Sequence, residues 1–386
     1  MKHRIAFVIQ RYGENFSGGA EYHCRQLALH LKKYYIVEVL TTCSKSTAPF
    51  DNYFNEGKVE DEGIEVVRFK VEDLHNQEPD QVLERIETLN IEHDFQLIKK
   101  RGPYCPGLIR YLIKNNSKYQ AVIFITSLFY TTVAGSLLGL NNTILLPTAH
   151  DEPDMYRHLY DKVFGAPSGI FYNSIDERRF IETRFPITKK IPSITTCVGI
   201  NEFKPKGYSK ENYLLYIGRI CSGKGCNRLI HYFRQYKKIH PSDLKLYMAG
   251  SVESEYKAEY CEDIKYLGFI TESEKNRMLE QALLFMIPSK YESLSLVLLE
   301  SLAAGTPVIV NGDCDVLKGQ CKRSNAGLFY SGYMEFEAVL DYMLSHKETY
   351  DQMCRNGIEF VKKEYDWDGV TSKINQFIAQ MENGEI

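Results

Sequence analysis

The chain has 386 residues, of which 44% are hydrophobic and 25% charged, and its formal net charge is −3. This length exceeds what a single hydrophobic core usually supports, so we expect two domains. A near-neutral charge gives no reason to expect duplex nucleic acid as a partner, and no run of about 18 apolar residues predicts a membrane-spanning helix.

The N-terminus and the cysteines indicate a cytoplasmic protein. The stretch MKHRIAFVIQ reads as a first strand, because no small-residue cleavage site follows its apolar run. The ten cysteines are scattered without a C-x-x-C pair, and neither Cys221 with Cys226 nor Cys314 with Cys321 has a second half suited to zinc. We therefore expect reduced, mostly buried thiols and no metal site.

Short apolar runs alternate with amphipathic segments along the chain, and the series occurs twice. In the first half the expected strands are RIAFVIQ, YIVEVLTT, IEVVRF, AVIFITS, TILLPTAH and GIFYNS; in the second they are YLLYIGR, LKLYMAG, IKYLGF, LLFMIPS and PVIVNG. Helical patterns such as AEYHCRQLALHLKKY and SEKNRMLEQALL lie between them. This alternation predicts an α/β protein with parallel, doubly wound sheets covered by helices on both faces.

A polar stretch rich in Gly, Pro and Lys, VGINEFKPKGYSKENY, separates the two series. It predicts a Rossmann-like domain at 1–203 and a second at 204–365. The remaining 366–386 continues as an amphipathic pattern that carries the single tryptophan, Trp367. We expect this terminal helix to pack its apolar face back on the first domain.

Ligands of open α/β sheets bind beyond the carboxyl ends of the strands, so we examined the residues there. After the first strand, Gly18 and Gly19 open a helix and let backbone N–H groups approach an anion, although a flexible turn explains the pair equally well. The strand TILLPTAH ends in His150 and Asp151, which suit a polar site, although a surface histidine with satisfied hydrogen bonds is the more common case.

The second series opens with YLLYIGRICSGKG, which places Arg219 and Lys224 on a glycine-rich strand-to-helix turn. An arginine fork and a lysine point charge suit a phosphate or diphosphate, which we favour over a solvated basic turn. The turn is not a Walker loop, because neither Ser nor Thr follows Lys224. Farther on, IKYLGF ends at Gly268 and Phe269, where backbone groups could receive a nucleotide base, although most such ends are plain turns.

The stretch SKYESLSLVLLESLAAG places a carboxylate on each side of a helix start. The helix is expected from about Ser295 to Ala304, with Glu292 in the loop before it and Glu300 inside it. Free N–H groups around Ser295 and Leu296 form an anion site, near Arg219 and Lys224 if the two loops adjoin. Carboxylates accept hydrogen bonds from sugar hydroxyls, and a diphosphate between two polyols is a nucleotide sugar.

Together these motifs resemble the GT-B-fold retaining glycosyltransferases of family 4, of the glycosyl transferases group 1 type. The resemblance covers nearly the whole chain and rests on SGGAEYH, His150-Asp151, VGINEFKP, GRICSGKG, LGF and PSKYESLSLVLLESLAAGTPVIV. It implies two Rossmann-like domains facing a cleft, with the acceptor on the first and the nucleotide sugar on the second. It also implies transfer with retention of anomeric configuration and without a metal.

The resemblance assigns roles to single residues. Arg219 and Lys224 would contact the diphosphate and stabilise the leaving group. Glu300 would bind the ribose hydroxyls and Glu292 the donor sugar, and His150 matches a histidine near that sugar. The remaining donor-binding candidates are Gly18, Gly19, Phe269, Ser295 and Leu296. This chain departs from the family where glycines are common, because Ser293 and Ser295 stand there.

The donor is expected to be a UDP-sugar in preference to a GDP-sugar, with no separate cofactor, and the acceptor a glycan or lipid-linked glycan in surface polysaccharide or glycoconjugate synthesis. The basic stretch LIKKRGPYCPGLIRYLIKNNSKY suits peripheral contact with the inner membrane face, but a solvated helix explains it slightly better. The cluster at 150–154 either binds acceptor hydroxyls or caps a helix. The alternatives are a nucleotide-sugar 2-epimerase of the same fold and a non-catalytic GT-B glycan-binding protein.

Overall fold

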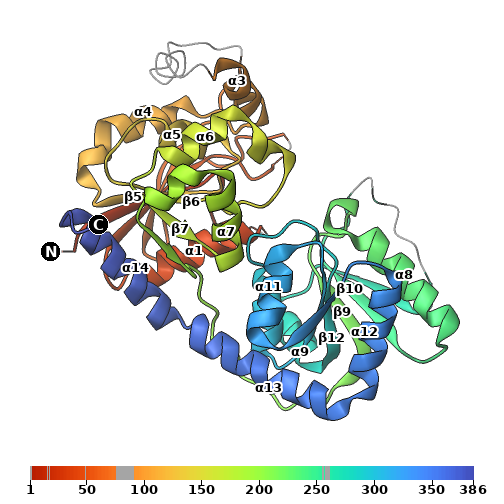
Figure 1. The fold of residues 1–386 in the computed structure, drawn as a ribbon. Helices are drawn as coiled ribbons and strands as arrows, with labels where there is room; N and C mark the ends of the chain where they lie inside the picture. Colours follow the sequence, from red (N-terminus) through yellow and green to blue (C-terminus); the bar gives the residue numbers. More distant parts are fainter. Residues whose placement is uncertain are drawn as a thin grey trace. The chain divides into compact units, whose positions relative to one another are not determined.

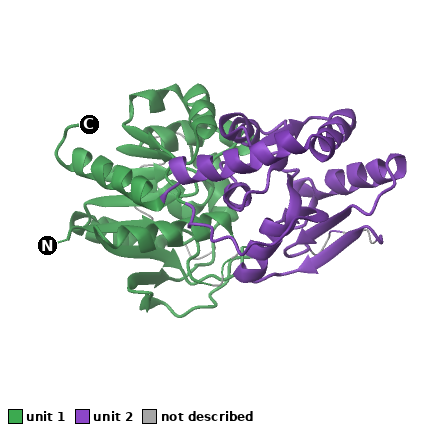
Figure 2. Cartoon of the chain, turned by 90° about the horizontal axis from the view of Figure 1, so that it is seen from below, with its two compact units in different colours: residues 1–199, 367–386 green, residues 200–366 purple. Residues whose placement is uncertain are grey.

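The computed structural model describes residues 2–14, 16, 18–47, 49–74, 91–253, 256 and 261–386. The chain forms two compact units (Figure 2): unit 1 comprises 1–199 with 367–386, and unit 2 comprises 200–366. Each unit holds a sheet of mainly parallel strands with helices against it (Figure 1). The predicted α/β class with two doubly wound domains is therefore confirmed.

The sheet of unit 1 has the strand order β3-β4-β2-β1-β5-β6-β7-β8, and only β3 and β4 pair antiparallel. Its strands are β1 (Arg4–Val8), β2 (Ile36–Thr42), β3 (Gly57–Asp61), β4 (Ile64–Phe69), β5 (Ala121–Ile125), β6 (Thr143–Leu146), β7 (Gly169–Tyr172) and β8 (Ser193–Thr195). The six apolar runs of the first half are all strands. The two edge strands β3 and β8 escaped prediction, because edge strands are short or polar and lack a buried apolar pattern.

Alternate residues of β1 enter two separate cores, one on each face of this sheet. Ile5 and Phe7 belong to a core shared with α1 (Gly19–Leu31) and α14 (Trp367–Glu382). Ala6 and Val8 belong to the core on the other face. The helices that build it are α3 (Glu92–Arg101), α4 (Pro106–Asn115), α5 (Tyr130–Ser136), α6 (His158–Gly165) and α7 (Ile175–Arg184).

The C-terminal helix α14 closes one of these cores. Its Trp367 ring stacks on His30 of α1 with centroids 4.1 Å apart, and a Cβ at Gly199 would lie 2.2 Å from the same indole. Phe377 meets Phe171 of β7 edge-to-face at 5.4 Å. The expectation that the terminal helix packs back on the first domain is confirmed, and Figure 1 shows α14 beside α1.

The sheet of unit 2 is all parallel, in the order β11-β10-β9-β12-β13-β14. Its strands are β9 (Glu211–Ile217), β10 (Lys245–Ala249), β11 (Ile264–Gly268), β12 (Ala282–Ile287), β13 (Val308–Asn311) and β14 (Gly327–Tyr330). Its helices are α8 (Cys226–Ile239), α9 (Glu272–Gln281), α10 (Leu296–Ala303), α11 (Asp315–Ser324), α12 (Tyr333–Ser345) and α13 (Lys347–Glu364). Neither α11 nor β14 was predicted from the sequence.

The order of this sheet reverses at its first strand. From β9 the chain adds β10 and β11 on one side and then β12, β13 and β14 on the other. The loops after β9 and β12 therefore leave neighbouring strand ends in opposite directions, and α/β proteins typically bind ligands at such a point. In unit 1 the same reversal falls between β1 and β5.

Among the described ranges, no helix is both long enough and apolar enough to span a bilayer.

Candidate functional site

The loops after β9 and β12 adjoin, as the proposed anion site requires. Lys224 Nζ lies 2.7 Å from Glu292 Oε1. Gly225, between the first loop and α8, has φ +76°, and a Cβ there would lie 2.4 Å from the carbonyl oxygen of Pro288. Arg228 Nη2 donates to that same oxygen at 3.3 Å. Lys224, which is predicted to bind the diphosphate, and Glu292, which is predicted to bind the sugar, thus lie on two loops in direct contact.

Glycines keep the neighbouring strand ends free of side chains. The N–H of Gly250, after β10, donates to the carbonyl of Gly268 at 2.7 Å, and a Cβ at Gly250 would lie 2.0 Å from the oxygen of Gly218. Phe269, just beyond β11, is 73% exposed. Because these glycines have no side chains, a flat ligand can approach the polar groups of the backbone closely. Gly250 was not singled out from the sequence, although it is the last residue of the predicted strand LKLYMAG.

The start of α10 lacks a side-chain cap, and its N-cap residue has an unfavourable backbone conformation. Ser295 is the N-cap residue, but its side chain makes no capping hydrogen bond to the helix. Its φ of 69° and ψ of 88° are left-handed, which costs a residue other than glycine about 1–2 kcal/mol. Glycine would adopt this conformation without that cost. The first-turn N–H groups, Leu296 included, are left facing the loop end without a serine hydroxyl cap.

Glu300 has a partner that sequence reasoning missed. Lys275 of α9 donates to Glu300 Oε1 at 2.8 Å and lies 3.0 Å from a carboxylate oxygen of Glu272. Burial raises the pKa of Glu300, and the ammonium of Lys275 opposes that rise. Arg219, by contrast, is exposed, so its guanidinium is accessible from solvent.

In unit 1, the glycine pair after β1 lies against an ion pair that was also not predicted. Arg11 contacts Glu21 Oε1 at 2.5 Å, and Gln10 Nε2 donates to the same oxygen at 3.0 Å. A Cβ at Gly18 would lie 1.9 Å from the other Glu21 oxygen, so a larger residue there would displace the Glu21 carboxylate. Gly19 begins α1, and a Cβ at this position would meet no atom within 4 Å.

His150 follows the end of β6, where a buried carboxylate joins two strands. Glu177 accepts from the backbone N–H of Ala149 at 2.7 Å and from that of Asn173 at 2.6 Å. Ser174 Oγ accepts from the N–H of Glu177, which caps α7. His150 Nδ1 lies 3.3 Å from Glu152 Oε1. The spacing Ser-x-x-Glu of Ser174 and Glu177 at a helix start is the sequence signal that could have indicated this carboxylate.

The raised pKa of Glu152 predicts that the stability of the protein depends on pH. Burial, with the nearby charge of Asp154, raises the pKa of Glu152 to about 7, while Arg101 opposes the rise. Because the folded pKa exceeds the unfolded one, the stabilising contribution is full below about pH 4.5 and is lost as pH rises through about 7. Glu152→Gln should therefore be more stable than the wild type at about pH 8, by about 1–2 kcal/mol after allowance for solvent screening.

Thermal unfolding at about pH 5 and about pH 8 measures this difference. Glu92→Gln, at an exposed position in the first turn of α3, controls for the loss of one negative charge. Equal stabilities of Glu152→Gln and wild type at the higher pH would contradict the assignment.

The basic stretch at 97–119 is largely engaged within unit 1. Lys99 is buried with its ammonium 4.5 Å from the ring centroid of Tyr104. Three further cations pair with carboxylates, in the pairs Arg101–Asp154, Arg110–Glu72 and Lys118–Glu38. This neutralisation leaves less basic surface than the sequence suggested.

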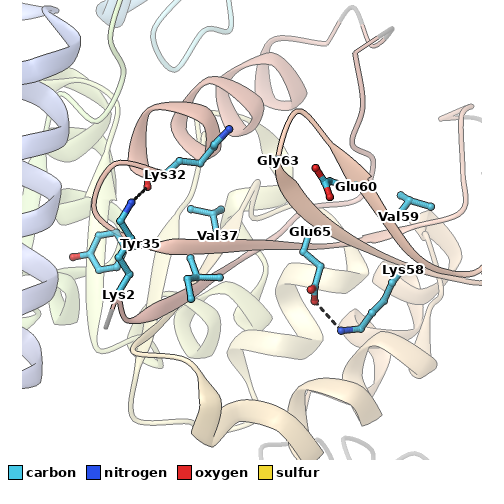
Figure 3. A pocket seen from close by; sticks show the side chains of 10 residues that line it. Lys2, Lys32, Tyr35, Val37, Lys58, Val59, Glu60, Gly63 and Glu65 are labelled. Atoms are coloured by element: carbon cyan, nitrogen blue, oxygen red, sulfur yellow. Dashed lines mark hydrogen bonds and ion pairs between the residues drawn. The ribbon is translucent and has the colours of Figure 1, made fainter.

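A pocket of about 520 Å³ lies elsewhere in unit 1 (Figure 3). Its lining comes from the amino ends of β2 and β4 and from β3, and includes Lys2, Lys32, Tyr35, Lys58 and Glu65. Lys2 donates to the carbonyl of Lys32 at 2.6 Å, and Lys58 to Glu65 at 2.8 Å. The pocket lies at the end of the sheet opposite to the strand ends that Gly18 and His150 follow, so it is separate from the predicted site. Nowhere in the described ranges do three or more His, Cys, Asp or Glu side chains form a group suited to a metal ion.

Two doubly wound units of this construction define the GT-B fold, and solved structures agree. Sucrose-phosphate synthase from Thermosynechococcus elongatus matches 99% of this chain and 100% of its own with a TM-score of 0.75 at 16% identity. Anabaena Alr3699/HepE in complex with UDP-glucose matches 98% of this chain and 99% of its own with a TM-score of 0.69 at 14% identity. At such identities the likeness concerns the fold.

Residues 200–360, which lie in unit 2, match the family model described as glycosyl transferases group 1. An uncharacterised glycosyltransferase of Methanocaldococcus jannaschii, MJ1607, is 27% identical over 186 residues, 45% of this chain and 46% of the relative. Glycogen synthase of Mycobacterium tuberculosis is 26% identical over 184 residues, 45% of this chain and 43% of the relative. Each match thus spans less than half of the curated relative.

Proposed function

We propose that the protein is a glycosyltransferase that moves a sugar from a nucleotide-sugar donor to a glycan or lipid-linked glycan. One observation carries the proposal. At the point where the strand order of unit 2 reverses, the loops after β9 and β12 meet and bring Lys224, Glu292 and the start of α10 together. Cations and helix N–H groups for a diphosphate then lie beside carboxylates for hydroxyl groups.

The chemistry required of these residues is to stabilise charge on a departing nucleoside diphosphate. Cleavage of the bond between the sugar and the diphosphate leaves negative charge on the phosphate oxygens. Lys224 and the first N–H groups of α10 lie at that place, and we propose that the exposed Arg219 joins them. Such positive groups lower the barrier by binding the developing charge. Glu292 is ion-paired with Lys224, so we propose that it accepts a donor-sugar hydroxyl and orients the lysine.

The finer features rest on the resemblance to family 4. They are retention of configuration, a UDP-sugar as donor, a role in surface polysaccharide or glycoconjugate synthesis, and a cytoplasmic location with possible membrane-peripheral contact. The assignments of Gly18, Gly19 and His150 in unit 1, and of Phe269 in unit 2, have the same basis. The family match of unit 2 and the UDP-glucose bound in one structure of the same fold support a nucleotide-sugar donor.

Thermal-shift screening against a panel of UDP- and GDP-sugars tests the donor. A donor present at about 100 times its Kd should stabilise the protein by about 2.7 kcal/mol, and one nucleotide class should do so selectively. Arg219→Ala and Glu300→Ala should each abolish most of the shift, because they remove a phosphate contact and a ribose contact.

The outcomes separate the candidate functions. No shift with any nucleotide sugar would contradict the proposal and favour a non-catalytic glycan-binding protein. Mass spectrometry of the donor after incubation alone would detect a C2 epimer if the protein were an epimerase.

A further inference from the structure

Lys275 and Glu300 form an ion pair between two helices of unit 2. Lys275 lies in the first turns of α9 and Glu300 in the middle of α10. Their side chains are 14% and 16% exposed, and the Nζ–Oε1 distance is 2.8 Å. Glu272, the second carboxylate on the ammonium, is 67% exposed and so is mostly solvated.

A structural tie between the helices is a poor explanation for this pair. Removing two charges from water costs several kcal/mol per ion, and apolar residues of similar volume join helices equally well. Most of the buried residues on the same two helices are apolar, among them Met278, Leu279, Leu298 and Leu299. A pair maintained in such surroundings points to a use for the charged carboxylate.

The two carboxylate oxygens of Glu300 can serve different partners. Oε1 accepts from Lys275, so its position and the rotamer of the side chain are fixed. Oε2 then retains the capacity to accept from a ligand, since a carboxylate has about four lone-pair sites.

We propose that Lys275 is a positioning residue for donor binding, which holds the Glu300 carboxylate ionised and in one orientation so that Oε2 accepts from the ribose hydroxyls. This inference rests on the proposed function, which assigns Glu300 to the ribose.

The pKa directions are consistent with the role. Burial raises the pKa of Glu300 on balance, and the charge and hydrogen bond of Lys275 limit that rise. Burial lowers the pKa of Lys275, but its two carboxylate partners outweigh burial and raise it, so the ammonium persists. Without Lys275, the carboxylate of Glu300 would take up a proton at a higher pH and lose its strength as an acceptor.

The test measures the Kd of UDP-glucose, with GDP-mannose as the second probe, by calorimetry at about pH 8 and about pH 5.5. Neither probe has a phosphate group that titrates in this range. The wild type should bind one probe with nearly the same affinity at both values. Lys275→Met should bind it about tenfold more weakly at the higher pH, because a charge-assisted hydrogen bond is loosened, and more weakly still at the lower pH.

Two further variants control the experiment. Lys275→Arg keeps the charge and should keep most of the affinity. Lys245→Met removes a lysine that pairs with Asp263 at 2.6 Å in the same unit, at the amino end of β10, and should bind like the wild type.

The outcomes distinguish the two levels of the account. If the wild type binds neither probe, the proposed function fails and the inference fails with it. If the wild type binds a probe and Lys275→Met binds it with the wild-type affinity at both pH values, only the inference is overturned. Should Lys275→Met not fold, the wild type still decides, because a loss of its affinity toward pH 5.5 would show that Glu300 is not held ionised.

Discussion

Replacing Lys224 by Met should reduce kcat/KM for sugar transfer by about 100- to 1000-fold. Removing one preorganised donor to a developing negative charge costs catalysis about 3–4 kcal/mol in comparable sites. The stability should change by no more than about 1 kcal/mol, because the pair with Glu292 is partly exposed, at 32% and 18% of the two side chains. The measurement is release of nucleoside diphosphate from the donor found in the thermal-shift screen, with an acceptor present.

Lys238→Met is the matched control, since Lys238 is exposed in the last turn of α8, at the opposite end of the helix that follows Lys224. It should keep wild-type kinetics. A Lys224→Met enzyme within about threefold of the wild type would show that this lysine does not stabilise the leaving group.

Gly225→Ala should both destabilise unit 2 and abolish the donor-induced thermal shift. The φ of +76° is unfavourable for alanine by about 1–2 kcal/mol. The new methyl group would also lie 2.4 Å from the carbonyl oxygen of Pro288, and neither can rotate away, because one is bonded directly to Cα and the other belongs to the backbone. We expect a total loss of about 2–4 kcal/mol, measured by thermal or denaturant unfolding. The two loops must separate to relieve the overlap, which moves Lys224 from Glu292.

Gly223→Ala, two residues earlier in the same loop, provides the control. A Cβ there would meet only the sulfur of Cys221 at 3.9 Å, an ordinary contact. This variant should retain the wild-type Tm and donor shift. If the two alanine variants behaved alike, close contact between the loops would not be what builds the site.

The sequence was sufficient for the features that local patterns encode. Buried apolar runs predicted eleven strands, and glycines and caps predicted where the loops after β9 and β12 end. The position of Glu292 in a loop and of Glu300 on a helix followed from the same reasoning, because helix start signals lie within a few residues. The site residues themselves remain predictions, supported by the contact between the two loops.

Contacts between distant segments were not predictable in this way. Lys275 and Glu300 are 25 residues apart and meet only because α9 and α10 pack together. Glu280 likewise accepts from the backbone N–H groups of Lys206, Gly207 and Tyr208, which fastens the polar linker to α9. Neither pairing leaves a periodic signal in the sequence. The left-handed backbone of Ser295 was equally hidden, since serine does not announce a positive φ as glycine does.

The central claim is that the loops after β9 and β12 hold the diphosphate of a nucleotide sugar. A crystal structure with the donor found in the screen tests it most directly. The account predicts phosphate oxygens within hydrogen-bond distance of Lys224 Nζ and the backbone N–H of Leu296, with ribose hydroxyls on Glu300. A nucleotide bound elsewhere, such as in the pocket lined by Lys2, Lys32 and Lys58, would contradict it.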